Sequence, residues 1–378
     1  MLKIEVKGVE FNNKGAEMML LSIMQALDSH FSNYQLVLSP GYLLPYEKRA
    51  KLGAWQKFSF TFCGIDWTWL GNLAPSSLKK MLCHFGIIVE KDIDIVFDAS
   101  GFVYSDHWGE HKIKQTLSHL KRISKSGQKY IFLPQAFGPF TDNNAYLMQE
   151  IMTQSKLIIA REQKSYDFLK AFEQSKKVEC FPDFTPLLTV ENTLQPKDLP
   201  QEYVSIIPNY KMFSKKSKVE KNCYIQFLIN VVSIVETFGL IPILLNHEGK
   251  EDYDICLAVN AACIKDIKIL NKMNALQVKK VIAHSTFCVS SRFHGCVSSL
   301  SQGVPSLATS WSHKYEALYQ LYQCENLILD INISYAQLSV HIENMILNRD
   351  LQASKLLELS QVHKNQCKAM WQLIFDKI

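Results

Sequence analysis

A guanidinium, an imidazole and a glycine follow one another closely at Arg292, His294 and Gly295, where an apolar run ends and a helix is expected to begin. The start of that helix would present free backbone N–H groups and the positive end of its dipole. Arginine adds a planar fork that can hold a phosphate or a carboxylate through two hydrogen bonds. This spacing predicts an anion-binding site. The alternative is a surface arginine beside a core histidine, and the position at a strand end disfavours it.

Two further cations follow the ends of expected strands. Lys314 comes after the next strand and could add a second positive charge to the same site, although a solvated lysine is the alternative. Arg161 directly follows an expected strand at 157–160, where a charged side chain would point into a cleft. The alternative for Arg161 is an ion pair with Glu162 or Asp167.

Two loops in the first half of the chain could also contact a ligand. Loop 12–16 opens a helix after a strand and resembles a phosphate-cradling turn, but it is neither a P-loop nor a dinucleotide-binding glycine motif. Asp98 and Asp106 follow another expected strand, and either could bind an acceptor hydroxyl or act as a base. Their alternative role is to cap the loop together with Ser100. No residue spacing is typical of zinc or calcium ligands, so no metal is expected.

Short apolar runs alternate with helical periods along the chain, which is typical of parallel sheets covered by helices. A proline-rich break at 181–200 interrupts the alternation. We therefore expect an α/β fold of two Rossmann-like, doubly wound domains that face a central cleft, with ligands at the carboxyl ends of the strands. The expected strands are 3–9, 34–39, 94–98, 129–134 and 157–160 before the break, and 203–208, 241–246, 267–270, 286–290 and 306–308 after it.

The predicted domain boundaries follow from that break. We predict an N-terminal domain over 1–190, a C-terminal domain over 201–345 and a final amphipathic helix over 351–378. An insert around 55–90 fits the alternation poorly and holds an aromatic cluster close to lysines. It either packs on the first sheet as a subdomain or presents an apolar, basic-rimmed surface to a membrane or a lipid-linked substrate.

Composition limits the class of protein. The 378 residues are 47% hydrophobic and 20% charged, which excludes a disordered chain. A net charge of +5 fits a protein that handles anions but is too small for a nucleic-acid binder. The ten cysteines include no CxxC pair, and no signal peptide or membrane-spanning segment is expected. We therefore expect the protein to be located in a reducing cytoplasm, with peripheral contact to the inner surface of the cytoplasmic membrane as an option.

The ordered motifs resemble the polysaccharide pyruvyl transferase family over about nine tenths of the chain. The most specific of them is Ser-Arg-Phe-His-Gly at 291–295. The other matching segments, in the family's order, are Asn12–Glu17, Asp98–Phe102, Pro134–Pro139, Ala160–Glu162, Phe181–Asp183, His247–Asp252, Pro305 and Lys314. The resemblance implies a GT-B type of fold and transfer of the enolpyruvyl unit of phosphoenolpyruvate onto a sugar. The product would be a pyruvate ketal on a surface polysaccharide or its lipid-linked precursor.

The resemblance also implies roles for particular residues. The second domain would bind the donor and the first the acceptor, with no cofactor and no nucleic acid. His294 is expected to be the acid that protonates the donor's methylene carbon, or a phosphate ligand, because histidine titrates near neutral pH. Asp98 or Asp106 would take the proton of the sugar hydroxyl. The expected donor-binding residues are Arg161, Ser291, Arg292, Gly295 and Lys314, and the expected acceptor-binding residues are Asn13, Lys14, Gly15, Ser100, Gly101 and Tyr104.

Two other functions remain open at this point. A glycosyltransferase with a sugar-nucleotide donor could use the same architecture, with a helix N-terminus against the diphosphate and Glu248 on the ribose or the sugar. A non-catalytic binding module in polysaccharide assembly is the second alternative.

Overall fold

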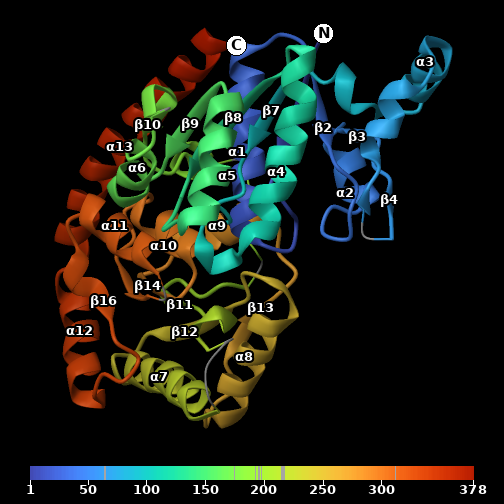
Figure 1. Cartoon of the computed structure of the whole chain (residues 1–378). Helices are drawn as coiled ribbons and strands as arrows, with labels where there is room; N and C mark the ends of the chain where they lie inside the picture. Colours follow the sequence, from blue (N-terminus) through green and yellow to red (C-terminus); the bar gives the residue numbers. More distant parts are fainter. Residues whose placement is uncertain are drawn as a thin grey trace. The chain divides into compact units, whose positions relative to one another are not determined.

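The computed structural model of the chain describes residues 1–63, 65–173, 175–191, 193–194, 196, 198–213, 218–310 and 312–378 (Figure 1). These residues form two compact units, and neither unit is one continuous stretch of sequence. Unit 1 comprises Met1–Phe11, Met19–Phe184 and Gln366–Ile378, and unit 2 comprises Asn12–Met18 and Thr185–Asn365. The domain boundaries predicted from the sequence stay a prediction.

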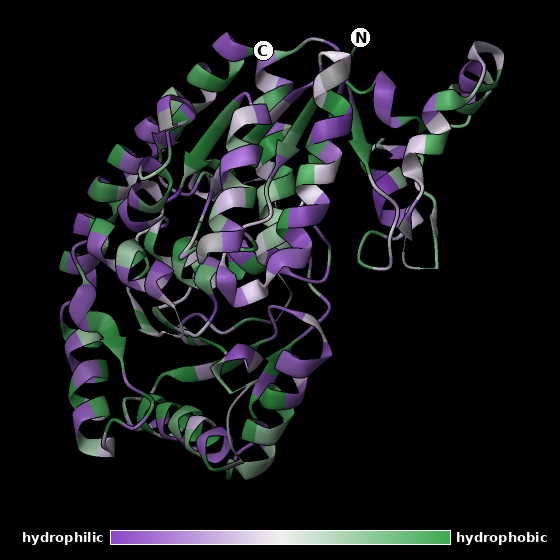
Figure 2. Cartoon of the chain, viewed as in Figure 1, coloured by the Kyte–Doolittle hydropathy of each residue, from purple (hydrophilic) through white to green (hydrophobic). Residues whose placement is uncertain are grey.

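Unit 1 is built on an eight-stranded sheet in which all the paired strands are parallel. The order across the sheet is β10-β9-β8-β7-β1-β2-β3-β6. Its central strands β7, β8 and β9 are buried along almost their whole length and mostly apolar, because helices cover both faces of the sheet (Figure 2). The strands are β1 (Leu2–Lys7), β2 (Tyr34–Leu38), β3 (Trp55–Lys57), β6 (Ile87–Ile88), β7 (Ile95–Asp98), β8 (Lys129–Gln135), β9 (Leu157–Ala160) and β10 (Val178–Cys180).

Helices pack on both faces of this sheet. Figure 1 shows α4 and α5 over one face, with α1 behind the sheet. On α4 the buried Ile113, Leu117 and Leu120 recur at the helical period, so this helix turns one apolar stripe to the core. The end of α13 also joins unit 1, where Trp371 packs edge-on against Phe97. These helices are α1 (Lys14–His30), α4 (Glu110–Ile123), α5 (Asp142–Gln154), α6 (Gln163–Lys170) and α13 (Arg349–Lys377).

The insert contributes both to the sheet and to the surface. Its strands β3 and β6 pair with the edge of the sheet, as expected for a subdomain that packs on it. Its strand β4 is exposed, and its helix α3 has no buried residue. The remaining elements of the insert, with the helix before them, are α2 (Tyr46–Lys51), β4 (Thr61–Phe62), β5 (Ile65–Asp66), the 3-10 helix η1 (Thr68–Leu73) and α3 (Ser76–His84).

Unit 2 is built on a six-stranded sheet whose paired strands are also parallel, in the order β13-β12-β11-β14-β15-β16. Its strands are β11 (Tyr203–Ile207), β12 (Ile241–Leu245), β13 (Lys268–Leu270), β14 (Phe287–Ser290), β15 (Ser306–Thr309) and β16 (Ile328–Leu329). Its helices are α7 (Lys218–Thr237), α8 (Gly249–Ala262), α9 (Ala275–Ala283), α10 (Phe293–Leu300), α11 (His313–Leu321) and α12 (Tyr335–Leu347).

The α/β class with two parallel sheets is therefore confirmed, and most predicted strands lie within one or two residues of the observed ones. In both sheets, the loops at the carboxyl ends of the strands carry the predicted site residues. In the part of the chain that the structure describes, no helix is both long enough and apolar enough to cross a membrane.

Candidate functional site

The N-termini of three helices meet in unit 2, which includes the first turn of α1 up to Met18. The backbone N–H of Lys14, at the start of α1, donates to the carbonyl of His247, just before α8, at 3.2 Å. Gly15 in the first turn of α1 lies against His294 in the first turn of α10. The guanidinium of Arg292 at the N-terminus of α10 pairs with a carboxylate of α8. The positive ends of α1, α8 and α10 therefore meet, which favours an anion.

Two glycines make this close approach of the helices possible. A Cβ atom on Gly15 would lie 2.1 Å from Nδ1 of His294, closer than any side chain could remain. A Cβ atom on Gly295 would lie 2.4 Å from Oγ of Ser290, at the end of β14. Glycine at both positions lets the backbone of α1 and α10 lie directly against these neighbours.

Arg292 is held rigidly by two acidic side chains. Its Nε and Nη2 donate to Asp252 at 2.7 and 2.6 Å, and its Nη1 pairs with Glu248. Asp252 is fully buried and Arg292 is nearly so, so the guanidinium has one fixed orientation. Sequence analysis gave no role to Asp252. The available signal was its spacing of four residues from Glu248 at the start of a helix that follows a strand.

His247 is a second residue to which sequence analysis gave no role. It is buried, and neither of its ring nitrogens has a hydrogen-bond partner among the described residues. Burial lowers the pKa of His247 well below its usual range, and the positive charges of Arg292, His294 and Lys14 lower it further. A neutral imidazole with two unsatisfied nitrogens at a meeting point of helix N-termini is typical of a ligand site.

Ser291 and Lys314, two further predicted donor-binding residues, have different surroundings. The Ser291 hydroxyl exchanges hydrogen bonds with Tyr224 and Thr309, each at 2.7 Å, so it pins the end of β14 to its neighbours. Nζ of Lys314 lies 5.2 Å from the centre of the Phe293 ring, next in sequence to His294. Lys314 can therefore add positive charge near the imidazole.

The predicted acceptor residues of the first loop belong to this same part of unit 2. Asn13 caps α1, since its Oδ1 accepts from the backbone N–H of Gly15 at 2.9 Å. Nζ of Lys14 lies 2.8 Å from Glu17. Asn13, Lys14 and Gly15 thus share a unit with Arg292 and His294, which were predicted for the donor.

Arg161 lies in unit 1 at the end of β9. Its Nη1 pairs with Asp183 at 3.3 Å, and its backbone N–H donates to the carbonyl of Gln135 at 3.0 Å. Arg161 therefore pairs with Asp183, an acid that sequence analysis did not consider for it. Three of the segments that carry the family resemblance, at the ends of β8, β9 and β10, meet around Arg161.

Asp98 lies in unit 1 under a loop that it holds in place. Its carboxylate accepts from the backbone N–H and hydroxyl of Ser100 at 3.1 and 2.6 Å, and from the hydroxyls of Tyr104 and Tyr130 at 2.6 and 2.5 Å. Burial raises the pKa of both tyrosines, and the charge of Asp98 raises it further. This environment matches the loop-capping alternative, and a role as base stays a prediction.

Asp106 and Gly101 lie in the same loop region. Asp106 accepts from Asn144 at 2.6 Å and from Thr141 at 3.1 Å, and its side chain is less buried than that of Asp98. Gly101 has a φ of +76°, which a residue with a side chain rarely adopts. The loop after β7 therefore has a defined shape.

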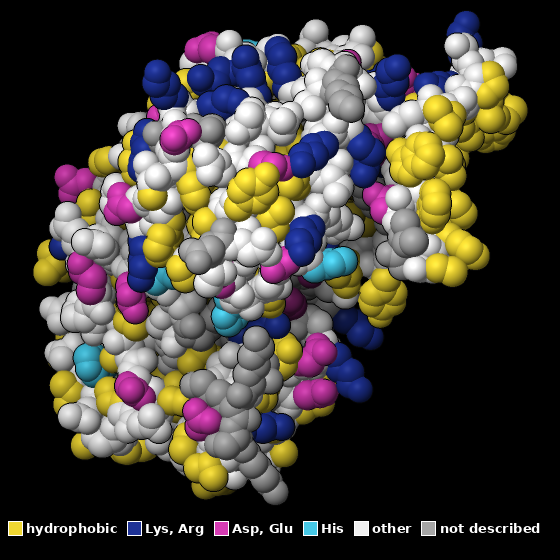
Figure 3. Space-filling view, viewed as in Figure 1, with side chains coloured by type: hydrophobic (Ala, Val, Ile, Leu, Met, Phe, Trp, Pro, Cys, Tyr) yellow, Lys and Arg dark blue, Asp and Glu magenta, His cyan; other side chains and the backbone are white. Residues whose placement is uncertain are grey.

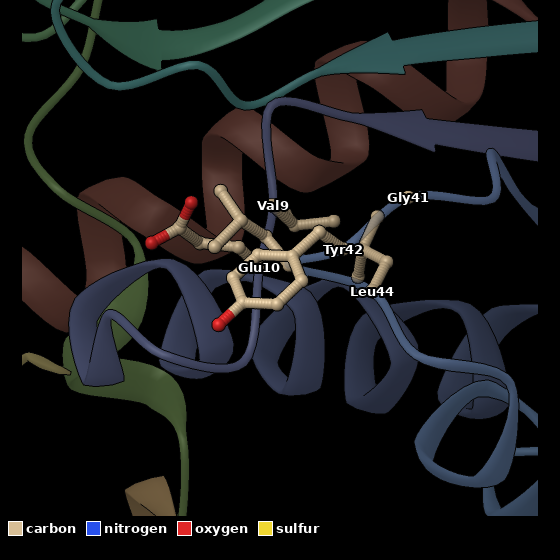
Figure 4. Close-up of a pocket in the computed structure, with 6 residues that line it drawn as sticks. Val9, Glu10, Gly41, Tyr42 and Leu44 are labelled. Atoms are coloured by element: carbon tan, nitrogen blue, oxygen red, sulfur yellow. The ribbon is translucent and has the colours of Figure 1, made fainter.

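A pocket of unit 1 lies between the loops that follow β1 and β2. Its volume is about 510 Å³. Figure 4 shows the Tyr42 ring and the Glu10 carboxylate projecting from the two loops. The pocket is lined by Val9, Glu10, Gly41, Tyr42, Leu43 and Leu44. Sequence analysis did not predict this pocket. Among the described residues, no group of three or more His, Cys, Asp or Glu side chains is arranged to hold a metal ion.

A family model described as polysaccharide pyruvyl transferase matches residues 13–313. Comparison with curated proteins found no match. Among solved structures, the chain is similar to UDP-GlcNAc 2-epimerase from Neisseria meningitidis bound to UDP-GlcNAc, with 11% identity, 100% of both chains covered and a TM-score of 0.62. It is also similar to Anabaena Alr3699/HepE in complex with UDP-glucose, with 13% identity, 100% and 99% of the two chains covered and a TM-score of 0.59. These likenesses show a fold of the GT-B type, as predicted.

Proposed function

Because the chain belongs to the polysaccharide pyruvyl transferase family, we propose that it moves the enolpyruvyl unit of phosphoenolpyruvate onto a sugar and closes a pyruvate ketal. The acceptor is a sugar of a surface polysaccharide or of its lipid-linked precursor. One observation carries the proposal for the donor: the N-termini of α1, α8 and α10 meet around His294 and Arg292 in unit 2.

The donor's charge fits this site. Phosphoenolpyruvate carries a phosphate and a carboxylate, and each needs strong donors when it leaves water. Helix N–H groups, the fixed guanidinium of Arg292 and the ammonium of Lys314 supply them. Arg161 of unit 1 is the second arginine that we assign to the donor, and Asp183 orients it.

His294 is the proton donor in the proposed reaction. It transfers a proton to the methylene carbon of phosphoenolpyruvate, which leaves an oxocarbenium-like centre that a sugar hydroxyl attacks. Loss of phosphate forms a second oxocarbenium-like centre, and a second hydroxyl of the sugar attacks it and closes the ketal ring. Each hydroxyl gives up one proton through a base. One of these protons replaces the proton that His294 gave to the methylene carbon, and the other leaves on the phosphate as hydrogen phosphate. Of the two predicted bases, Asp106 is the more accessible.

Phosphate release from phosphoenolpyruvate with an acceptor glycan tests the role of His294. The variant His294→Ala should lower the rate by about 10²–10⁴-fold, as expected for loss of a general acid. His284→Ala, which removes an exposed imidazole from the end of α9, is the matched control and should keep normal turnover. A His294→Ala enzyme with near-normal turnover would exclude this role.

Thermal shift assays separate the proposed donor from the sugar-nucleotide alternative. Phosphoenolpyruvate should raise the melting temperature, because a ligand that binds only the folded state stabilises it. The variant Arg292→Met should lose that shift. Stabilisation by a UDP-sugar alone, with none by phosphoenolpyruvate, would favour a glycosyltransferase instead.

A further inference from the structure

One region of unit 1 exposes much more apolar surface than the rest of the chain. Residues 42–85 are 44 of 378, yet they hold eleven of the 27 large hydrophobic side chains that are exposed among the described residues. Single exposed hydrophobic residues are normal on a protein surface, but a concentration of them marks an interaction site. The concentration of exposed hydrophobic side chains in residues 42–85 therefore indicates a surface that binds a partner.

We call one part of this region the apolar insert surface, and it consists of side chains from β4, η1 and α3 and from the residue after α3. Their exposed fractions run from 37% to 75%. Figure 3 shows hydrophobic side chains gathered over this part of the molecule, where Figure 1 labels α3 and β4. The apolar insert surface comprises Phe62, Trp69, Leu73, Leu78, Met81 and Phe85.

The exposed charge of this region is positive. Residues 42–85 contain six lysines or arginines and two acidic residues. Two of the cations, Arg49 and Lys57, are buried, so the surface charge comes from the other four. One of the two acids, Asp66, is held in an ion pair with an arginine of α4. Lys48, Lys51 and Lys80 are exposed. Aromatic and aliphatic side chains next to lysines are the composition of a surface that rests on anionic lipid.

We propose that the apolar insert surface docks on a lipid bilayer that contains anionic head groups. Its side chains would enter the boundary between head groups and acyl chains, while the lysines contact the phosphates. Charge favours this occupant over a second copy of the chain. A symmetric dimer would place this positive face against itself, and the like charges would repel.

The pocket between the β1 and β2 loops adjoins this region in sequence. Tyr42 and Leu43 line the pocket, are themselves exposed, and are the first two residues of the region 42–85. The exposed side chains of Tyr42 and Leu43 would add to the apolar area available to the bilayer. Entry of a lipid-linked sugar into this pocket would depend on the proposed function. Docking on the bilayer does not depend on it.

Vesicle flotation with the full chain tests the proposal. The chain should float with vesicles of phosphatidylcholine and phosphatidylglycerol, and binding to phosphatidylcholine alone should be at least about tenfold weaker. The double variant Leu73→Ser with Phe85→Ser should lower binding about tenfold, because it removes apolar area that would enter the bilayer. The double variant Lys79→Glu with Lys80→Glu should do the same through charge.

A matched control distinguishes this surface from general stickiness. Leu347→Ser with Leu351→Ser removes two side chains of unit 2 that are as exposed as Leu73, and it should leave binding unchanged. Equal melting temperatures would show that all the variants fold. Absence of flotation, or equal flotation of every variant, would overturn the proposal. A dimer that the insert variants dissociate, without vesicle binding, would assign the surface to a second copy. Because flotation needs no substrate, loss of activity and loss of docking are separate results.

Discussion

Gly15 shows how a single missing side chain can matter for chemistry. A Cβ atom there would lie 2.1 Å from Nδ1 of His294, so the variant Gly15→Ala must push the imidazole aside. The same clash should lower the free energy of unfolding by about 1–3 kcal/mol, which outweighs the better helix propensity of alanine. A displacement of about 1 Å at a reacting group can cost roughly 10²-fold in rate, and we expect a loss of that order in kcat/KM for phosphate release.

A double-mutant cycle tells whether that loss passes through His294. Adding Gly15→Ala to His294→Ala should then cost nothing further, because the displaced group is already absent. A loss of similar size in both backgrounds would mean that the alanine disturbs the helix start itself. Normal activity of Gly15→Ala alone would show that the imidazole can move without consequence.

At the level of elements, α9 anchors the segment at Thr185, where the second and longer stretch of unit 2 begins. The ammonium of Lys279 is buried and donates to the carbonyls of Thr185 and Leu188 at 2.7 and 2.9 Å. The variant Lys279→Met should leave these carbonyls short of donors and lower the free energy of unfolding by roughly 2–4 kcal/mol. Urea unfolding measures this change. Its neighbour Lys280→Met is the control, and an equal effect of both variants would contradict a specific anchor.

The elements also show which features the sequence could predict. Buried strands such as β9 were predicted to the residue, because an apolar run bounded by polar residues leaves little choice. The last two strands at one end of the sheet, β3 and β6, were missed, since two or three residues carry no periodic signal. The strand-end position predicted Arg292 as a site residue. Its partner Asp252 lies 40 residues away in sequence, and only the folded chain brings the two together.

At the scale of the whole molecule, each unit buries one histidine that stays neutral. Burial lowers the pKa of His119 in unit 1 well below its usual range, and Lys7, Lys57 and Arg122 lower it further. Glu90 lies 3.8 Å from Nε2 of His119, but two cations already pair with that carboxylate. His247 has the same lowered pKa in unit 2. Both units should therefore respond to acid in the same direction.

The direction of this pH dependence follows from the number of protons that the folded and the unfolded chain bind. Unfolded histidine has a pKa near 6.5, so below that pH the unfolded chain takes up a proton at each position while the folded chain does not. The contribution of these two histidines to the free energy of unfolding should be constant above about pH 7.5, and below pH 6.5 each should lower that free energy by roughly 1.4 kcal/mol per pH unit. Urea titrations between pH 7.5 and 5.5 measure this slope, and His119→Gln or His247→Gln should each remove its own share. His111→Gln, at an exposed position, should leave the slope unchanged. A slope that survives both buried substitutions would assign the acid sensitivity to other groups.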